Sequence, residues 1–185
     1  MRSCLLVLLY VFGVASLQAK QKPSTIYAIP LPAKPDFSAL EWLIGNWNGY
    51  TTSRGPQGEI HLSVEFALDR RYIVFREELS LAASGTAPAA KEAWMGILSG
   101  GSSGATFVLR IFSSTGFVTR YRVSVDGPEV HFDPDGGDQP PPGWLFRRNL
   151  LRSDESEFTE TVQVAPPQRS FFDYYTAKLT RVPRR

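Results

Sequence analysis

Two carboxylates in the C-terminal part of the chain have surroundings that suit acid–base chemistry. Glu160 and Asp173 lie among apolar residues, on two segments that we expect to be neighbouring strands. If both side chains point into an apolar interior, desolvation raises their pKa values toward the range of a general acid or base. The alternation in 169–180 allows either face to point inward. A small enzyme with Glu160 and Asp173 as its buried carboxylates is therefore an alternative hypothesis.

A second kind of chemistry is suggested by the Gly-x-Ser-x-Gly spacing at 100–104. Its serine, Ser102, precedes Asp126 and His131 in the chain order of the α/β-hydrolase triad. A nucleophile of that type sits on a turn that leads directly into a helix, whereas 105–112 alternates as a strand. We therefore interpret 100–104 as a hairpin loop and predict no catalytic residue there.

Metal ligands are sparse. Asp133, Asp135 and Asp138 resemble the first half of a calcium loop, but the twelfth position is Trp144, where an EF-hand has a bidentate glutamate. The only histidines are His61 and His131. We predict no metal site.

The N-terminal residues have the layout of a secretory signal peptide. Arg2 is followed by an apolar run from Leu5 to Val14 and by small residues up to Ala19. We expect cleavage after Ala19, with Ala15 as the alternative, and a secreted or periplasmic protein with no membrane span after cleavage. The only cysteine, Cys4, leaves with 1–19, so disulfides are excluded from the mature chain. Residues 20–36 are a proline-rich linker, and 37–182 are the folded domain.

Beyond the linker, a short helix is predicted to precede a long series of strands. Asp36 occupies a capping position, and Phe37, Leu40, Leu43 and Ile44 recur at helical spacing before Gly45 ends the helix. Strand patterns separated by turn formers follow at 46–54, 58–68, 71–81, 91–99, 105–112, 116–126, 129–133, 143–152, 156–164 and 169–180.

Two of these strands show a dry face and a wet face. The apolar residues Ile60, Leu62, Val64, Phe66 and Leu68 alternate with His61, Ser63 and Glu65. In the second, Phe117, Tyr121, Val123 and Val125 alternate with Val118, Arg120, Arg122 and Ser124. About ten half-buried antiparallel strands leave two open edges unless the sheet closes on itself. The pattern therefore predicts an all-β, up-and-down antiparallel barrel of about 8–10 strands.

The motif Gly45-x-Trp47-x-Gly49, placed after a short helix and before many strands, resembles the lipocalin-like members of the calycin superfamily. The similarity is to the uncharacterised bacterial lipocalin-like domains and, more distantly, to the nitrobindin-like haem-binding barrels. The further glycines of the nitrobindin-like pattern are replaced here by 50–56. The resemblance implies that Trp47 closes one end of the barrel and stacks with Arg181, with Gly45 completing this closure.

The nitrobindin-like resemblance also implies haem, held by a histidine late in the chain. No histidine follows His131, which leaves Tyr174 or Tyr175 as an oxygen ligand or a displaced His131. We expect both histidines on the outer face and therefore no cofactor, with haem kept as an alternative.

Our leading interpretation is a barrel that binds a small hydrophobic or amphipathic ligand. The candidate ligand-lining residues are the aromatic side chains of the dry faces: Phe66, Phe107, Tyr121, Phe158, Phe171 and Tyr175. The balance of 20 Lys and Arg against 18 Asp and Glu gives no basic surplus for a nucleic-acid partner. A third hypothesis is an interaction module that presents a sheet edge or the loop at 133–143 to another protein.

Overall fold

The computed structural model describes residues 29–52, 57–85, 88–101 and 106–183. The predicted signal peptide at 1–19, the first part of the predicted linker and Ser102 lie outside these ranges. Residues 29–36 form neither helix nor strand. The folded part, Ala33–Arg185, is one compact unit. No helix in the described ranges is long and apolar enough to cross a membrane.

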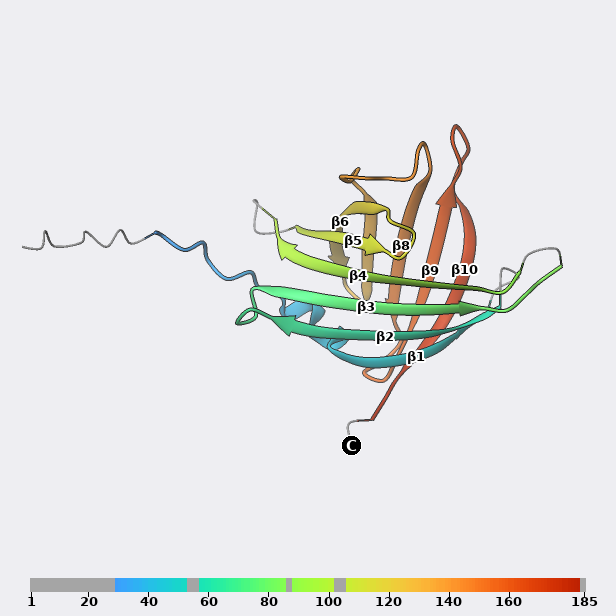
Figure 1. Ribbon diagram of the computed structural model, residues 1–185. Coiled ribbons are helices and arrows are strands. Elements are labelled where there is room, and N and C mark those ends of the chain that lie inside the picture. The colour runs from blue at the N-terminus through green and yellow to red at the C-terminus, as the bar shows by residue number, and fades with distance from the viewer. Residues whose placement is uncertain (1–28, 53–56, 86–87, 102–105, 184–185) are drawn as a thin grey trace, which may run out of the picture. The chain divides into compact units, whose positions relative to one another are not determined.

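Ten strands form one closed antiparallel barrel in which neighbours in the chain are neighbours in the sheet, and β1 pairs with β10 (Figure 1). β1 to β4 run across the view of Figure 1, and β8 to β10 run up it. The predicted fold class is thereby confirmed and is consistent with a calycin-like barrel. The strands are β1 (Gly45–Thr51), β2 (Gly58–Ala67), β3 (Tyr72–Leu81), β4 (Ala90–Gly100), β5 (Phe107–Ser113), β6 (Val118–Asp126), β7 (Glu129–Pro134), β8 (Leu145–Arg152), β9 (Glu157–Ala165) and β10 (Phe172–Arg181).

The predicted alternation of faces holds within β2 and β6 and fails just outside their ends. Phe117, predicted on the dry face with Tyr121, is 38% exposed because it precedes the first residue of β6. In β2, Ile60 and Val64 are buried while His61 is exposed, so the apolar face lines the interior. Leu68, predicted on the same face, is instead 74% exposed. It lies in the turn before β3 with φ of 47°, so the strand has already ended there.

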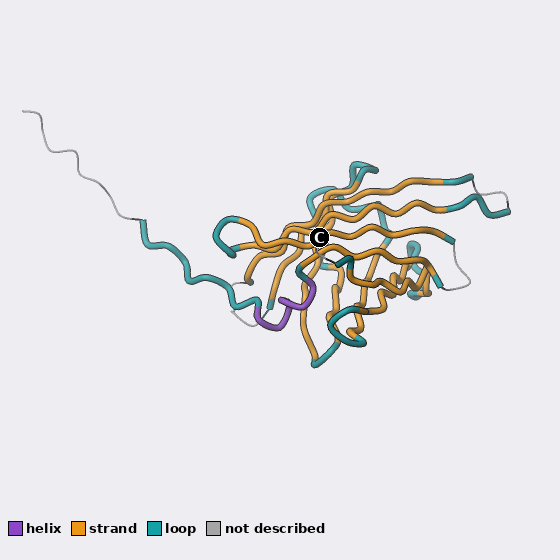
Figure 2. Tube along the Cα trace, turned by 90° about the horizontal axis from the view of Figure 1, so that it is seen from below, coloured by secondary structure: helices purple, strands orange, loops and turns teal. Residues whose placement is uncertain are grey.

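A short helix, η1 (Ser38–Leu43), is a 3-10 helix beside one end of the barrel (purple in Figure 2). Asp36 Oδ1 accepts a hydrogen bond of 2.9 Å from the Ser38 amide, but the N-cap residue is Phe37, so Asp36 lies one position before the cap that it was predicted to provide. Leu40 and Leu43 are buried in the same apolar core as the strands. The helix therefore adds an apolar plug to the strand ends.

Trp47 and Arg181 lie together at this end of the barrel. The Arg181 guanidinium carbon is 4.2 Å from the centre of the Trp47 ring, and its Nη1 donates to the Ile44 carbonyl at 2.7 Å. The Trp47 indole donates to the Leu43 carbonyl at 2.8 Å. Gly45, at φ 143°, approaches Arg181 so closely that an added Cβ would lie 2.6 Å from Nη1. These contacts join the helix to the first and last strands.

Candidate functional site

Three charged side chains meet inside the barrel. Glu77 on β3 is 2% exposed, Glu160 on β9 is 3% exposed, and the side chain of Arg148 on β8 is 15% exposed. Arg148 Nη1 donates to Glu160 Oε1 at 2.6 Å and to both carboxylate oxygens of Glu77 at 3.3 Å. One guanidinium nitrogen therefore bridges two buried carboxylates, and we call these three residues the interior charge cluster.

Strand alternation explains why these polar side chains point inward. Glu77 shares its face of β3 with Phe75 and Leu79, and Glu160 lies between the inward-facing Phe158 and Val162 on β9. A buried charge costs several kcal/mol of desolvation unless it is paired and hydrogen-bonded. Such a cluster does not by itself favour folding, so its presence suggests a function.

Aromatic side chains surround the interior charge cluster. The Trp94 indole donates to Glu77 Oε1 at 2.7 Å, and the Arg148 guanidinium carbon lies 4.7 Å from the centre of the Trp94 ring. Tyr175 on β10 is 2% exposed, and Tyr121 on β6 is also buried. Trp94 is only half-buried, so the aromatic lining extends from the cluster toward solvent.

The surroundings shift the pKa values of the buried groups. Burial raises the pKa of Glu160 to about 7, together with the negative charge of Glu77 and against the opposing effect of Arg148. Burial alone lowers the pKa of Arg148, but the neighbouring acidic side chains, Glu77 first, raise it well above its usual value, so the guanidinium stays charged. Burial, followed by Glu160 and Glu77, raises the pKa of Tyr175 well above its usual range. Tyr175 is therefore a neutral hydroxyl.

Two polar atoms beside the interior charge cluster are buried without a hydrogen-bond partner among the described residues. They are Glu160 Oε2 and the Tyr175 hydroxyl oxygen. The Tyr175 hydroxyl lies near enough to Glu160 to favour its ionised form, but the geometry of a hydrogen bond is not met. Since a buried polar group without a partner costs about 1–3 kcal/mol, these two atoms offer binding capacity to a ligand.

A break in the register of β10 places a second tyrosine beside Tyr175. Gln163 and Val162 are successive residues of β9 but pair with Asp173 and Tyr175, which leaves Tyr174 unpaired between them. The rings of Tyr174 and Tyr175 are 5.8 Å apart, and both pack against the core. Burial and then the nearby Glu92 raise the pKa of Tyr174. Bulges of this kind occur often next to binding sites.

The predicted ligand-lining residues do not gather at one place. Tyr121 and Tyr175 lie beside Arg148, whose pKa both affect. Phe66 and Phe107 lie near Phe37, with ring centres 6.3 and 5.4 Å from it, at the end that the helix plugs. The other two make separate contacts: Phe158 packs on Trp47 at 4.8 Å, and Phe171 lies 4.2 Å from the Arg147 guanidinium carbon.

Of the two carboxylates predicted to be buried, one is buried and the other is exposed. Glu160 is buried, but Asp173 is exposed and accepts a hydrogen bond of 2.7 Å from the Gln163 amide. The buried partner of Glu160 is Glu77 instead. The sequence contained the signal for it, because Glu77 shares the odd-numbered apolar positions of 71–81 with Ile73, Phe75 and Leu79.

Both histidines lie on the outer surface of the barrel. His61 is exposed and contacts Asn48 Oδ1 at 2.9 Å. His131 contacts Asn149 Oδ1 at 3.0 Å and Glu129 Oε2 at 3.3 Å. A haem group inside the barrel would find no imidazole ligand from this chain, and Tyr175 is kept from forming a phenolate by its raised pKa. The interior therefore does not fit a haem site of the predicted kind.

No group of three His, Cys, Asp or Glu side chains suited to a metal ion occurs in the part of the chain that the structure describes. Asp135, from the predicted calcium-like loop, lies instead 3.1 Å from Arg120 Nε and 3.6 Å from Arg122 Nη2. Its carboxylate is thus held by arginines of β6.

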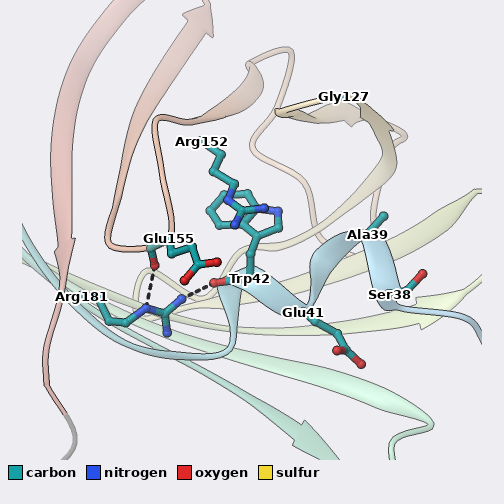
Figure 3. Close-up of a pocket in the computed structure, with 8 residues that line it drawn as sticks. All are labelled: Ser38, Ala39, Glu41, Trp42, Gly127, Arg152, Glu155 and Arg181. Carbon is teal, nitrogen blue, oxygen red and sulfur yellow. Dashed lines mark hydrogen bonds between the residues drawn. The ribbon is translucent and has the colours of Figure 1, made fainter.

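A surface groove of about 580 Å³ lies beside the short helix (Figure 3). Arg181 at its base donates to the carbonyls of Glu155 and Trp42, the two bonds drawn in Figure 3. Arg152 lies over the Trp42 ring at 5.6 Å. Because these contacts hold the end of the barrel together, we interpret the groove as a consequence of that closure.

Comparisons with known proteins support the fold alone. No protein-family model matches the chain, and no curated protein matches it. Among solved structures, the barrel is similar to the crystal structure of Rv2717c from M. tuberculosis, with a TM-score of 0.57 and 15% sequence identity. The match covers 80% of this chain and 97% of that one. At this identity, the likeness establishes a shared barrel architecture.

Proposed function

We propose that this protein is a lipocalin-like barrel of the calycin type that binds a small amphipathic molecule beside the interior charge cluster. The observation that carries the proposal is the pair of buried, unpartnered polar atoms, Glu160 Oε2 and Tyr175 Oη. A ligand that supplied hydrogen bonds to them would recover the free energy that their burial costs.

The surroundings of these atoms suit a ligand with a polar head and an apolar body. Val162 and Leu79 are buried on the same inner face, and the half-buried Trp94 and Tyr174 add aromatic surface. Binding sites for small molecules are typically apolar, with a few convergent polar groups that fix the orientation of the ligand. A polar head at Glu160 and Tyr175 and an apolar body along the aromatic side chains meet this description.

Native mass spectrometry of the protein purified from its own source tests the proposal. We expect a bound mass that disappears under denaturing conditions and that is reduced in Glu160→Gln. The matched control is Glu157→Gln, on the same strand but paired with Lys178 at 2.7 Å outside the interior. A bound mass retained equally by both variants would place the ligand elsewhere and overturn the site.

Secretion or export to the periplasm belongs to the same proposal and rests on the pattern of 1–19. N-terminal sequencing of the mature protein tests it. We expect Lys20 as the first residue, or Ser16 if cleavage follows Ala15. Recovery of a full-length chain from the cytoplasm contradicts it.

A second candidate function, acid–base catalysis on the bound molecule, is favoured by the Glu160 carboxyl, whose pKa is about 7. If the protein is an enzyme, the wild-type protein converts its co-purified ligand during incubation while Glu160→Gln binds it unchanged. Mass spectrometry before and after incubation distinguishes a catalyst from a binder, since a binder returns the ligand intact.

A further inference from the structure

We propose that the molecule bound beside the interior charge cluster carries a protonated amine, whose ammonium group donates to Glu160 Oε2 and to the neighbouring Tyr175 hydroxyl oxygen. This inference deepens the proposed function and rests on it. The charge of the cluster, the chemistry of the two unpartnered atoms and the aromatic faces around them all favour an amine.

The interior has more negative than positive side chains. The groups that face Glu160 are Glu77 from β3, Arg148 from β8 and Tyr175 from β10. Tyr121 from β6 acts on Arg148, and Glu92 from β4 acts on Tyr175. With Tyr175 as a neutral hydroxyl, one arginine faces two buried carboxylates, and Glu92 adds a third carboxylate nearer to solvent. When both buried carboxylates are ionised, Arg148 neutralises one of the two negative charges, and a ligand with one positive charge neutralises the other.

The unpartnered atoms also match an ammonium group in their hydrogen-bonding chemistry. A primary ammonium has three N–H donors and no acceptor. Glu160 Oε2 is an acceptor without a donor of its own when the carboxyl group is ionised, and the Tyr175 oxygen accepts through its lone pairs. A carboxylate ligand would instead meet Glu160 and Glu77 with charge of the same sign, which is repulsive in a desolvated site.

The aromatic rings provide a third kind of attraction for a cation. Trp94 already has the Arg148 guanidinium over its face at 4.7 Å, and Tyr174 and Tyr175 present two further rings close to each other. A cation near such faces gains about 0.5–2 kcal/mol, with the larger values in desolvated sites. These rings therefore favour an amine over a neutral head group of the same size.

Isothermal titration calorimetry with three probes of matched shape tests the inference: 2-phenylethylamine, 2-phenylethanol and phenylacetate. At pH 8 we expect the amine to bind at least about tenfold more tightly than the alcohol and phenylacetate not to bind. Binding of the alcohol or phenylacetate without preference for the amine overturns the amine inference and leaves the proposed function intact. Failure of all three probes, repeated with hexylamine, hexanol and hexanoate, overturns both.

The pH dependence of amine binding is a test that needs no substitution. Because the ammonium pairs with ionised Glu160, binding is linked to loss of the Glu160 proton, whose pKa is about 7. We expect the affinity for 2-phenylethylamine to rise about tenfold from pH 6 to pH 8, while the affinity for 2-phenylethanol stays unchanged. An amine affinity that falls or stays constant over this range contradicts the pairing.

Substitutions then locate the ammonium group. Glu160→Gln should remove both the preference for the amine and its pH dependence, and Tyr175→Phe should weaken amine binding while retaining the pH dependence. Glu157→Gln, the matched control on β9, should behave as the wild-type protein. A cluster with a purely structural role changes the free energy of unfolding in Glu160→Gln but leaves the ranking of the three probes as it was, and this outcome overturns the inference.

Discussion

Arg148 Nη1 lies 2.6 Å from Glu160 Oε1 and 3.3 Å from Glu77 Oε2, so a single nitrogen bridges carboxylates that come from β9 and β3. These strands are far apart around the barrel, since β9 pairs with β8 and β10 whereas β3 pairs with β2 and β4. The contact therefore links opposite parts of the wall through the interior. Its energetic role and its role in binding can be separated by substitution.

Removing the arginine should cost more than an ordinary ion pair. In Arg148→Met both glutamates lose their cation inside the barrel, and we expect the free energy of unfolding at pH 8 to fall by about 3–5 kcal/mol, measured by chemical denaturation. Glu77→Gln and Glu160→Gln, introduced together with Arg148→Met, should restore most of the loss.

The control for this prediction is Arg76→Met on β3, which removes the exposed Arg76–Glu65 pair. Exposed pairs contribute about 0–1 kcal/mol, so this variant should remain close to the wild-type protein. Equal losses in Arg76→Met and Arg148→Met would show that the interior charge cluster has no special energetic role.

Stability should fall as pH rises from about 4.5 to about 7. The ordinary pKa of the Glu160 carboxyl is 4.5 and its pKa in the fold is about 7, so between these values the folded chain binds a proton that the unfolded chain has lost. Denaturation at a series of pH values should show a decline of up to about 3 kcal/mol that levels off above pH 7.

The same decline should be absent in Glu160→Gln and preserved in Glu157→Gln. The carboxyl groups with lowered pKa values, Asp36, Asp69 and Asp154, act below this window, because their stabilising effect is lost only as pH falls below about 3.8. A wild-type slope that survives in Glu160→Gln must come from another group.

Gly45→Ala should destabilise the plugged end of the barrel. At φ 143° a side chain is strained, and its Cβ would lie 2.6 Å from Arg181 Nη1, the donor to the Ile44 carbonyl. Gly116→Ala, at φ 86° with no atom within 4 Å of its Cβ, has the backbone strain alone, about 1–3 kcal/mol. We expect a larger loss of unfolding free energy for Gly45→Ala, and equal losses would assign the whole effect to the backbone.

Mixing the protein with haemin should give no sharp, saturable shift of the Soret band. His61 and His131 both lie on the outer surface, so neither can reach iron inside the barrel. His61→Ala and His131→Ala should leave any weak absorbance change as it is in the wild-type protein. A stoichiometric shift that either substitution abolishes would refute the assignment of both side chains to the outer face.

The fold could be predicted from local patterns because the turn formers are distinct from the alternating segments. Each of the ten predicted strands occurs within three residues of its predicted ends. Leu68 was placed wrongly because a turn with positive φ follows β2 without a glycine or proline to mark it. The predicted short helix is confirmed, and its six residues form a 3-10 helix, a geometry that short segments often adopt.

The candidate site was harder to predict, because a single extra residue reverses the parity of a strand. Asp173 and Tyr175 are two positions apart and should share a face, yet the unpaired Tyr174 between them leaves Asp173 exposed and Tyr175 buried. The meeting of Glu77 with Glu160 depends on closure of the barrel, which brings β3 opposite β9. Local alternation assigns each side chain to the inner or the outer face of the barrel, but it does not show which inner side chains contact one another.

The contact between Ile44 and Arg181 spans 137 positions, because the first strand of the barrel pairs with the last. Contacts between residues so distant in the chain form late, since the entropy of closing a long loop must be overcome before they contribute. Until β10 has been synthesised and has docked, β1 and β9 each present an unpaired strand edge of the kind that promotes aggregation. Folding of this protein is therefore expected to be slow for its size, with completion of the C-terminal strand as the event that protects the chain.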